Sequence, residues 1–311
     1  MLSGALLEGP RARGAFMLRA VMDPPWSMRI EDEAPLALVA LVSGEAWIVP
    51  EPGPPIHLGP GDIVVCRGPD HYTVTHDPAE RPDIRILPGE RCVTADGVEL
   101  VDTMNLGVRT WGNRADGETV MLVGTYQLDG DVSQRLLNVL PPFVVLAAEQ
   151  WDCPLLPVLA SEITKDDPGQ GVVLDRLLDL LLIAVLRTWL ARPEAGAPGW
   201  YKAQSDPIVG PAIRALHHNP AHPWTVADLA KESGVSRAAL ARRFTELVGE
   251  PPMAFLTAWR LALAADLLLE PGATIGAVAR KVGYSSPYAL STAFKRNRGV
   301  SPRQHRVAAL A

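Results

Sequence analysis

Short apolar runs broken by turn-forming residues dominate the first half of the chain. Between residues 36 and 123, stretches rich in Val, Ile and Leu alternate with Gly, Pro and Asp at intervals of roughly 8–12 residues, as in a β-sandwich or β-barrel. Four stretches are the clearest predicted strands: residues 36–42, 46–49, 62–66 and 71–75. We therefore expect a β-rich N-terminal domain.

Helical spacing of apolar residues replaces this pattern after about residue 133. Residues 133–140 and 172–191 are predicted helices, and the second carries Leu at the intervals of an amphipathic helix. Residues 192–199 read RPEAGAPG, which is typical of a linker because little in it can pack. The predicted division is a domain at residues 1–191, a linker at 192–206 and a second domain at 207–311.

The last third of the chain carries start and stop signals for seven helices. Asp206 before Pro207 marks the first start, and Thr225 with Asp228 three residues later predicts a capping box. Glycines are expected to end four of these helices: Gly234, Gly249, Gly283 and Gly299. The predicted fold class is α+β, with a β-barrel and its helical extension followed by an all-α domain.

Two pairs of these helices share the pattern of a helix-turn-helix unit. Such a unit needs a small residue where its helices cross, Gly at the turn and an apolar anchor on the second helix. In the first pair these residues are Ala230, Gly234 and Leu240. In the second pair they are Ala279, Gly283 and Leu290, so the anchor comes one residue later. The joining helix, residues 253–269, is ~25 Å long, which suits two recognition helices in successive major grooves.

Charge is divided unevenly between the two halves. Residues 200–311 hold 14 Lys and Arg against seven Asp and Glu, a net charge of +7, whereas residues 1–199 carry −13. A basic segment beside an acidic one indicates an anionic partner for the basic segment. No signal peptide or membrane-spanning segment is predicted, so we expect a cytoplasmic protein without a membrane partner.

Residues 207–306 resemble the DNA-binding domain of the AraC/XylS family of transcription regulators. The resemblance is strongest in AxxxGYSSPYALSTAFKRNRGVSPRQHR, which starts at Ala279 and contains the motifs GYS at 283–285, FK at 294–295 and GVSP at 299–302. It implies a double-stranded DNA partner, with RNA polymerase as a further candidate partner. It also implies a regulator of transcription rather than an enzyme.

The resemblance implies three sets of DNA-contacting residues. Those expected to face bases from the first recognition helix are Arg237, Ala238, Ala241 and Arg242. The corresponding set in the second recognition helix is Ser286, Tyr288, Ala289 and Thr292. Expected contacts to the DNA backbone come from Arg243, Lys295, Arg296 and Arg298. Arg242 is the main candidate for a bidentate guanine contact, with a phosphate contact as its alternative, and packing on the protein is the alternative for Tyr288.

The N-terminal domain resembles a cupin, a small β-barrel. The residues that carry this resemblance are SGEAW at 43–47, LGPGDIVV at 58–65 and GPDH at 68–71. A metal-dependent cupin enzyme needs a His-x-His…Glu motif, and residues 34–49 contain no His. We therefore expect no cofactor, and treat a cupin enzyme with an accessory DNA-binding domain as the alternative function. A metal held by His57, His71, His76 and a cysteine is the remaining metal hypothesis.

A sensor domain is the preferred interpretation of the barrel. Its expected effector is an unknown small molecule, with Trp47, His71, Tyr72 and Trp111 as candidate pocket residues. The alternative signal is an oxidant acting on Cys66 or Cys92, since Arg67 and Arg91 stand beside them in the sequence. The apolar helix at 174–191 is a candidate homodimer contact, with burial inside a single chain as the alternative. A third hypothesis, a DNA-repair alkyl transferase, would need an activated Cys, and Cys153 is followed by Pro rather than by a catalytic partner.

Overall fold

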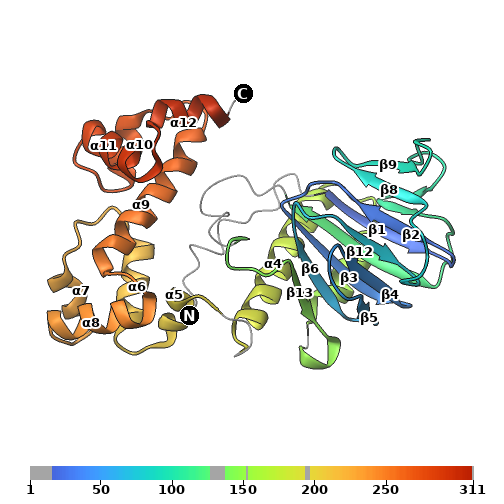
Figure 1. Ribbon diagram of the computed structural model, residues 1–311, viewed down its shortest axis with the longest axis horizontal. Helices are drawn as coiled ribbons and strands as arrows, with labels where there is room; N and C mark the ends of the chain where they lie inside the picture. The colour runs from blue at the N-terminus through green and yellow to red at the C-terminus, as the bar shows by residue number, and fades with distance from the viewer. Residues whose placement is uncertain (1–15, 127–136, 152, 193–196, 310–311) are drawn as a thin grey trace. The chain divides into compact units, whose positions relative to one another are not determined.

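A computed structural model describes residues 16–126, 137–151, 153–192 and 197–309 of the protein (Figure 1). The chain divides into two compact units. The first holds residues 10–128 and 140–192, and the second is built on the C-terminal segment from residue 193 onwards. Each unit has its own hydrophobic core.

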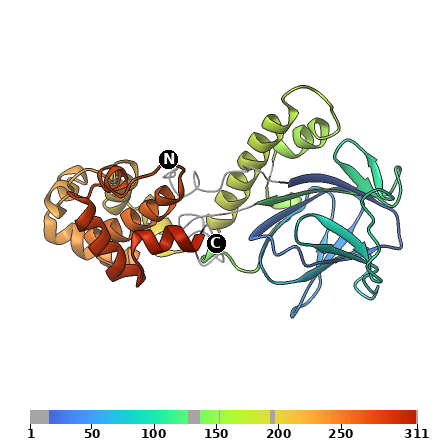
Figure 2. The same ribbon diagram turned by 90° about the horizontal axis from the view of Figure 1, so that it is seen from above.

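The first unit contains two sheets that face one another, as Figure 2 shows. Among the described residues, the seven-stranded sheet has the order β10-β11-β1-β12-β3-β6-β13 and the six-stranded sheet the order β5-β4-β7-β2-β8-β9. Most neighbours are antiparallel, whereas β1–β11 and β2–β8 are parallel. The strands are β1 (Phe16–Met22), β2 (Ser27–Ile30), β3 (Leu36–Ser43), β4 (Ala46–Pro50), β5 (Ile56–Leu58), β6 (Ile63–Arg67), β7 (Tyr72–Thr75), β8 (Ile84–Leu87), β9 (Arg91–Thr94), β10 (Asn105–Gly107), β11 (Thr110–Gly112), β12 (Thr119–Tyr126) and β13 (Phe143–Leu146).

All four clearest predicted strands are present, as β3, β4, β6 and β7. Their inward-facing side chains form one core between the two sheets, which includes Trp26, Leu41, Ile48 and Leu58. The period of two in a strand explains this packing, since alternate residues point to the same face. The β-rich fold expected for the N-terminal domain is therefore confirmed.

A long helix, α4 (Gln170–Leu190), covers one face of the seven-stranded sheet. It begins after Gly169, whose φ of 86° is left-handed. A Cβ at Gly124 of β12 would lie 2.7 Å from the side chain of Leu178, so glycine allows the helix to approach the strand. The Tyr126 hydroxyl donates a hydrogen bond of 2.9 Å to the Leu178 carbonyl oxygen. The shorter helix α3 (Leu155–Glu162) packs on α4.

The helix predicted at 172–191 thus corresponds to α4. Of the helix predicted at 133–140, residues 133–136 lie outside the described residues, and residues 138–140 form a turn and a bend.

The second unit contains the seven predicted helices, α6 to α12, within the described residues. They are α6 (Val209–His218), α7 (Val226–Glu232), α8 (Arg237–Val248), α9 (Pro252–Leu269), α10 (Ile275–Lys281), α11 (Pro287–Arg298) and α12 (Pro302–Ala309). Thr225 and Asp228 form the expected capping box, in which each side chain accepts a hydrogen bond from the other residue's amide. The Asp206 carboxylate accepts bonds from the first amides of α6.

Helical structure begins earlier than the linker prediction placed it. Residues Gly199–Lys202 form α5, and Ala203–Ser205 form a 3-10 helix, η3. Trp200 packs against the core of the first helix-turn-helix unit, and Ala203 is fully buried there. A Cβ at Gly199 would lie 2.2 Å from the Leu247 carbonyl oxygen, which explains a glycine at this contact. The apolar Trp200 was the sequence signal that this segment packs rather than links.

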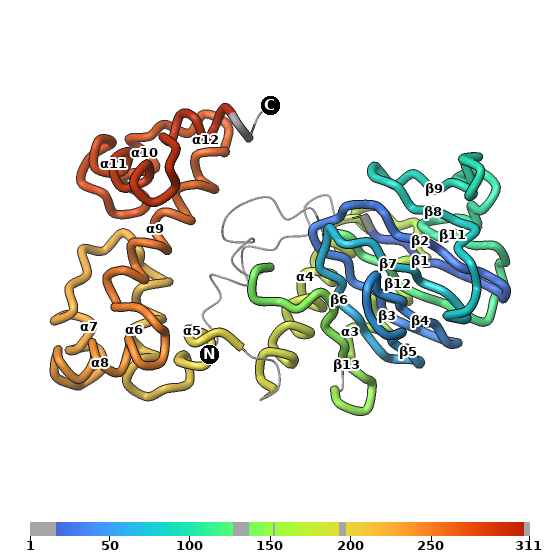
Figure 3. The backbone as a smooth tube through the Cα atoms, viewed as in Figure 1, coloured from blue at the N-terminus to red at the C-terminus, as the bar shows by residue number. Residues whose placement is uncertain are grey.

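The central helix α9 connects the two helix-turn-helix units, as the backbone trace in Figure 3 shows. Of the helices in the described part of the chain, α9 alone has the length and apolar composition to cross a membrane. Half of it is buried inside the unit, where Leu256, Trp259 and Leu268 belong to the core.

The one-residue shift of the second anchor arises in the turn. Leu240 and Leu290 are both fully buried, and each is the fourth residue of its helix. One residue separates Gly234 from the N-cap Ser236, whereas two separate Gly283 from the N-cap Ser286. The longer second turn therefore absorbs the extra residue, and the two recognition helices have equivalent anchors.

Candidate nucleic-acid interface and sensor cavity

The two recognition helices, α8 and α11, both begin with a serine N-cap. The Ser236 hydroxyl accepts a hydrogen bond of 3.2 Å from the Ala239 amide, and the Ser286 hydroxyl accepts one of 3.1 Å from the Ala289 amide. Such caps satisfy amides that a helix start leaves without partners. They fix the first turn of each helix, which is the part that reaches base edges in helix-turn-helix proteins.

The first recognition helix presents its expected residues on the surface. Arg237, Ala238 and Arg242 are exposed, and Ala241 is half-buried. Arg242 has a side chain 78% exposed and lies 3.7 Å from the Glu246 carboxylate one turn later. An exposed pair of this kind is weak, so the guanidinium is available to DNA at little cost.

In the second recognition helix, two of the four expected residues do not correspond in position to those of the first helix. By place in the helix, Tyr288 corresponds to Ala238 and Thr292 to Arg242. Tyr288 is 81% exposed, so the alternative that it packs on the protein does not hold in this structure. The residues equivalent to Arg237 and Ala241 are Pro287 and Ser291, rather than the proposed Ser286 and Ala289. The sequence signal for this shift was the anchor Leu290, which follows its turn glycine one residue later than Leu240 does.

Two of the four residues expected to contact the DNA backbone, Arg243 and Arg298, interact with other residues of the protein instead. Arg243 donates hydrogen bonds of 3.2 and 2.9 Å to the Asp206 carboxylate. Burial raises the pKa of Asp206, but the Val209 and Ile208 amides and Arg243 together hold this pKa below its usual value. Arg243 therefore ties the recognition helix to the start of α6.

Arg298 is half-buried, and its guanidinium lies 5.0 Å from the centre of the Phe294 ring. Burial lowers the pKa of this group. Lys295 and Arg296 are exposed on the same helix. Of the three basic residues of α11 expected to contact the DNA backbone, Lys295 and Arg296 are therefore exposed, while Arg298 packs on the ring.

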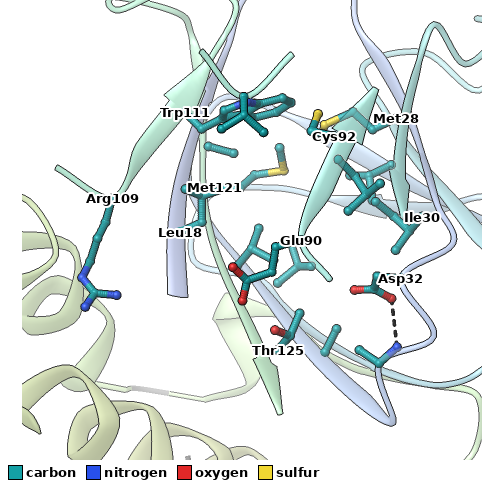
Figure 4. A pocket seen from close by; sticks show the side chains of 18 of the residues that line it. Leu18, Met28, Ile30, Asp32, Glu90, Cys92, Arg109, Trp111, Met121 and Thr125 are labelled. Carbon is teal, nitrogen blue, oxygen red and sulfur yellow. Dashed lines mark hydrogen bonds between the residues drawn. The ribbon is translucent and has the colours of Figure 1, made fainter. Parts of the chain in front are cut away.

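A cavity of about 620 Å³ lies in the first unit, among strands of both sheets (Figure 4). Its walls are largely apolar, and its polar lining comes mainly from loops and strand ends. The lining includes Leu18, Met28, Ile30, Asp32, Val39, Tyr72, Glu90, Cys92, Arg109, Trp111, Met121, Val123 and Thr125. This volume falls within the range of small-molecule sites, which are concave, mostly apolar and provided with a few polar groups.

Two of the four candidate pocket residues line this cavity, namely Tyr72 and Trp111. Trp47 lies outside it because Ala46 and Ile48, its neighbours on β4, are the inward-facing residues. The centre of its ring lies 4.7 Å from that of the His57 ring, and the two ring planes are tilted by 57°. His71 is exposed and is also absent from the lining.

Three charged residues of the lining were not among the predicted pocket residues: Asp32, Glu90 and Arg109. Glu90 and Arg109 occupy the turns β8–β9 and β10–β11, with left-handed φ values of 62° and 46°. Among the described residues, the third non-glycine residue with such a backbone is Glu33, next to Asp32. Backbone conformations of this kind are costly and gather at binding sites.

The environments of Cys66 and Cys92 oppose the redox hypothesis. Both thiols are buried, and burial raises the pKa of each from 9.0 to about 12. A redox sensor needs the opposite shift, since the thiolate is the reactive form. Arg91 does not stabilise a Cys92 thiolate, because its side chain points away from Cys92 on the strand and pairs with Glu99 at 2.5 Å. Adjacent residues in a strand face opposite sides, which is why the sequence neighbours misled.

The histidine hypothesis for a metal is also contradicted. His57 lies 3.4 Å from Glu45 on the outer face of the sheet, and His71 is exposed elsewhere. His76 Nδ1 lies 2.8 Å from the Trp26 carbonyl oxygen and 3.1 Å from its amide nitrogen. Within the part of the chain that the structure describes, no three His, Cys, Asp or Glu side chains come together as a metal site requires.

Known proteins match both units. A cupin family matches residues 2–191, and a helix-turn-helix domain family matches residues 229–308. A putative AraC-like transcription regulator of Streptomyces lividans is 35% identical over 260 residues, which cover 81% of this chain and 80% of that protein. The HTH-type transcriptional regulator AlkR of Acinetobacter baylyi is 31% identical over 264 residues, covering 78% and 86%.

Solved structures match the C-terminal part. The DNA-binding domain of AdpA, a global transcriptional factor crystallised with a target DNA, is 35% identical, covers 33% of this chain and 93% of that chain, and has a TM-score of 0.31. The family assignment rests on the sequence matches. The chain belongs to the AraC family of DNA-binding transcription regulators, with an N-terminal cupin domain and a C-terminal double helix-turn-helix domain.

Proposed function

We propose that this regulator reads two adjacent half-sites on DNA and responds to a small molecule bound in its cupin cavity. The observation that carries the DNA part is the pair of equivalent, capped recognition helices joined by one helix, α9. The Arg260 side chain of α9 donates to the Pro220 and His222 carbonyl oxygens, and the Gly283 turn packs on Ala221. These contacts favour a fixed spacing between the two helices.

The roles of individual residues follow from their exposure. Arg242 is suited to the two acceptors of a guanine in the major groove. Tyr288 and Thr292 would read the second half-site, and Lys295 and Arg296 would bind phosphates. Ala238 leaves room at the protein surface and suits contact with a thymine methyl group.

Strand β12 offers a path from the cavity to α4. Val123 and Thr125 line the cavity on one face of the strand. Gly124 and Tyr126, on the opposite face, contact Leu178 of α4. A ligand that displaces β12 would therefore shift the helix that precedes the connection to the DNA-binding domain.

A second copy of the chain is the proposed partner for α4. Its outer face exposes Val172, Val173 and Leu180, of which Leu180 is 51% exposed. A homodimer formed through α4 would carry two DNA-binding domains and would double the number of contacts to DNA in the cytoplasm.

Salt-dependent binding tests the DNA interface. Each phosphate contact contributes nearly one unit to the slope of log affinity against log salt concentration. We expect Arg296→Ala to reduce this slope by ~1 for a duplex of random sequence. Arg243→Ala is the matched control, since Asp206 holds this side chain, and it should leave the slope unchanged. Fluorescence anisotropy across a salt series measures both, and a slope of zero for the intact protein would contradict the proposal.

A further inference from the structure

The cupin cavity has two chemically different sides. Figure 4 shows Trp111, Met28 and Cys92 gathered on one side and the carboxylates of Asp32 and Glu90 on the other. The first side is buried, with Trp111 8%, Met28 5% and Cys92 5% exposed. Glu90 is exposed, so the acidic side is the one that reaches the solvent.

The two carboxylates lack a cationic partner within the described ranges. Asp32 accepts hydrogen bonds from the Ala34 amide, at 3.1 Å, and from its own amide, and neither Asp32 nor Glu90 takes part in an ion pair there. His71, when protonated, has the smallest effect on Asp32: it lowers the pKa of this carboxylate without forming an ion pair with it. Burial raises the pKa of Asp32, because an ionised carboxylate loses hydration in this position.

Arg109 lines the cavity but directs its charge elsewhere. Its guanidinium points away from the two carboxylates in Figure 4. Its Nη2 lies 3.6 Å from the position that a Cβ on Gly171 of α4 would occupy, and its charge acts on Asp175 of the same helix. The cavity entrance therefore presents net negative charge to a ligand.

We infer that the cavity binds a small amphiphilic cation, with its apolar body against Trp111 and Met28 and its positive group beside Asp32 and Glu90. A cation in this position supplies the opposite charge that a partly desolvated carboxylate needs. An anionic ligand would meet repulsion from both acids. A neutral apolar ligand would remove more water from Asp32 without replacing it by a partner. This inference specifies the effector class of the proposed function.

Binding of three ligands with one chain length tests the inference: decylammonium, decanol and decanoate. They differ in the charge of the head group and share the apolar body. Isothermal titration calorimetry of the full chain should show decylammonium binding at least about tenfold more tightly than decanol, with decanoate the weakest, since charge-assisted hydrogen bonds contribute about 1.5–3 kcal/mol. Equal affinities for decylammonium and decanol, or tighter binding of decanoate, would overturn it.

Variants assign the charge preference to the two acids. Glu90→Gln and Asp32→Asn should each reduce the preference for decylammonium over decanol several-fold while decanol binding persists. Asp96→Asn, an exposed acid outside the lining, removes the same charge and should leave the preference intact. Glu90 is exposed, so its variant is informative even if Asp32→Asn fails to fold. A preference that survives both substitutions would place the cation elsewhere.

DNA affinity measured on the same samples separates this inference from the proposed function. A cation preference that depends on Asp32 and Glu90, together with an unchanged DNA affinity, would uphold the ligand class and refute the sensing role. A DNA affinity that changes on ligand addition, with no preference for decylammonium over decanol, would uphold the sensing role and refute the ligand class.

Discussion

Arg242 and Arg243 stand side by side in the sequence, yet their surroundings assign them different tasks. Arg242 is 78% exposed on the surface of the recognition helix, whereas Arg243 bonds the carboxylate that also caps α6. The sequence alone supports DNA contact for both, because both are basic residues on a recognition helix. The partner that distinguishes them, Asp206, lies 37 residues earlier.

The cysteines give a prediction at the residue scale. Because burial raises the pKa of Cys66 and Cys92 to about 12, alkylation by iodoacetamide at pH 8 should modify the partly exposed Cys153 and spare the other two. Peptide mass spectrometry after a timed reaction measures this. The unfolded protein, in which all three thiols should react, is the control. Rapid modification of Cys66 or Cys92 in the folded protein would restore the oxidant hypothesis.

The same shifts set a direction for the pH dependence of stability. A folded-state pKa above the unfolded value stabilises the folded protein while the group is protonated in both states. The contribution of these thiols is therefore complete below about pH 9, and it is lost as the pH rises from 9 towards 12.

At the scale of elements, the two helix-turn-helix turns are alike in conformation and different in packing. Gly234 and Gly283 have φ values of 66° and 83°. A Cβ at Gly234 would meet nothing within 4 Å, whereas one at Gly283 would lie 2.7 Å from the Ala221 carbonyl oxygen. The second turn is thus pressed against the loop between α6 and α7.

Alanine at each turn tests this difference. Gly234→Ala should cost about 1–2 kcal/mol of unfolding free energy, the cost of a left-handed backbone for a residue with a Cβ. Gly283→Ala should cost more, since the backbone of Ala221 must also move. Urea denaturation of both variants measures the two values, and equal losses would show that the Ala221 contact contributes nothing.

Local patterns in the sequence predicted the elements well and the cavity poorly. Period-two runs identified β3, β4, β6 and β7, and caps such as Thr225 and Ser236 identified the helices, because these signals act over a few residues. The cavity depends on strands brought together by the sheet order. Asp32 and Glu90 come from loops that are far apart in the sequence, and neither carries a motif.

The sequence did predict part of the cavity. Tyr72 and Trp111 are large residues with a polar atom, and both line it. Trp47 does not line the cavity, because the register of β4 places its side chain on the outer face of the sheet. A one-residue difference in register decides which face a strand residue occupies.

At the scale of the whole molecule, the domain that binds DNA and the domain with the cavity are separate compact units. Membership of the AraC family shows that the protein is a DNA-binding transcription regulator. The two equivalent recognition helices lead to the main proposal, that the protein reads two half-sites.

Selection from a random DNA library by the full chain, followed by sequencing, tests that claim most directly. If the two recognition helices read two half-sites, the selected sequences contain two short conserved blocks whose centres are about 10 base pairs apart, one helical turn. Arg242→Ala should relax one block, at a cost of about 1–3 kcal/mol at its preferred base pair, and Tyr288→Ala should relax the other. A single conserved block, or the same block altered by both variants, would show that the two helices do not read separate half-sites.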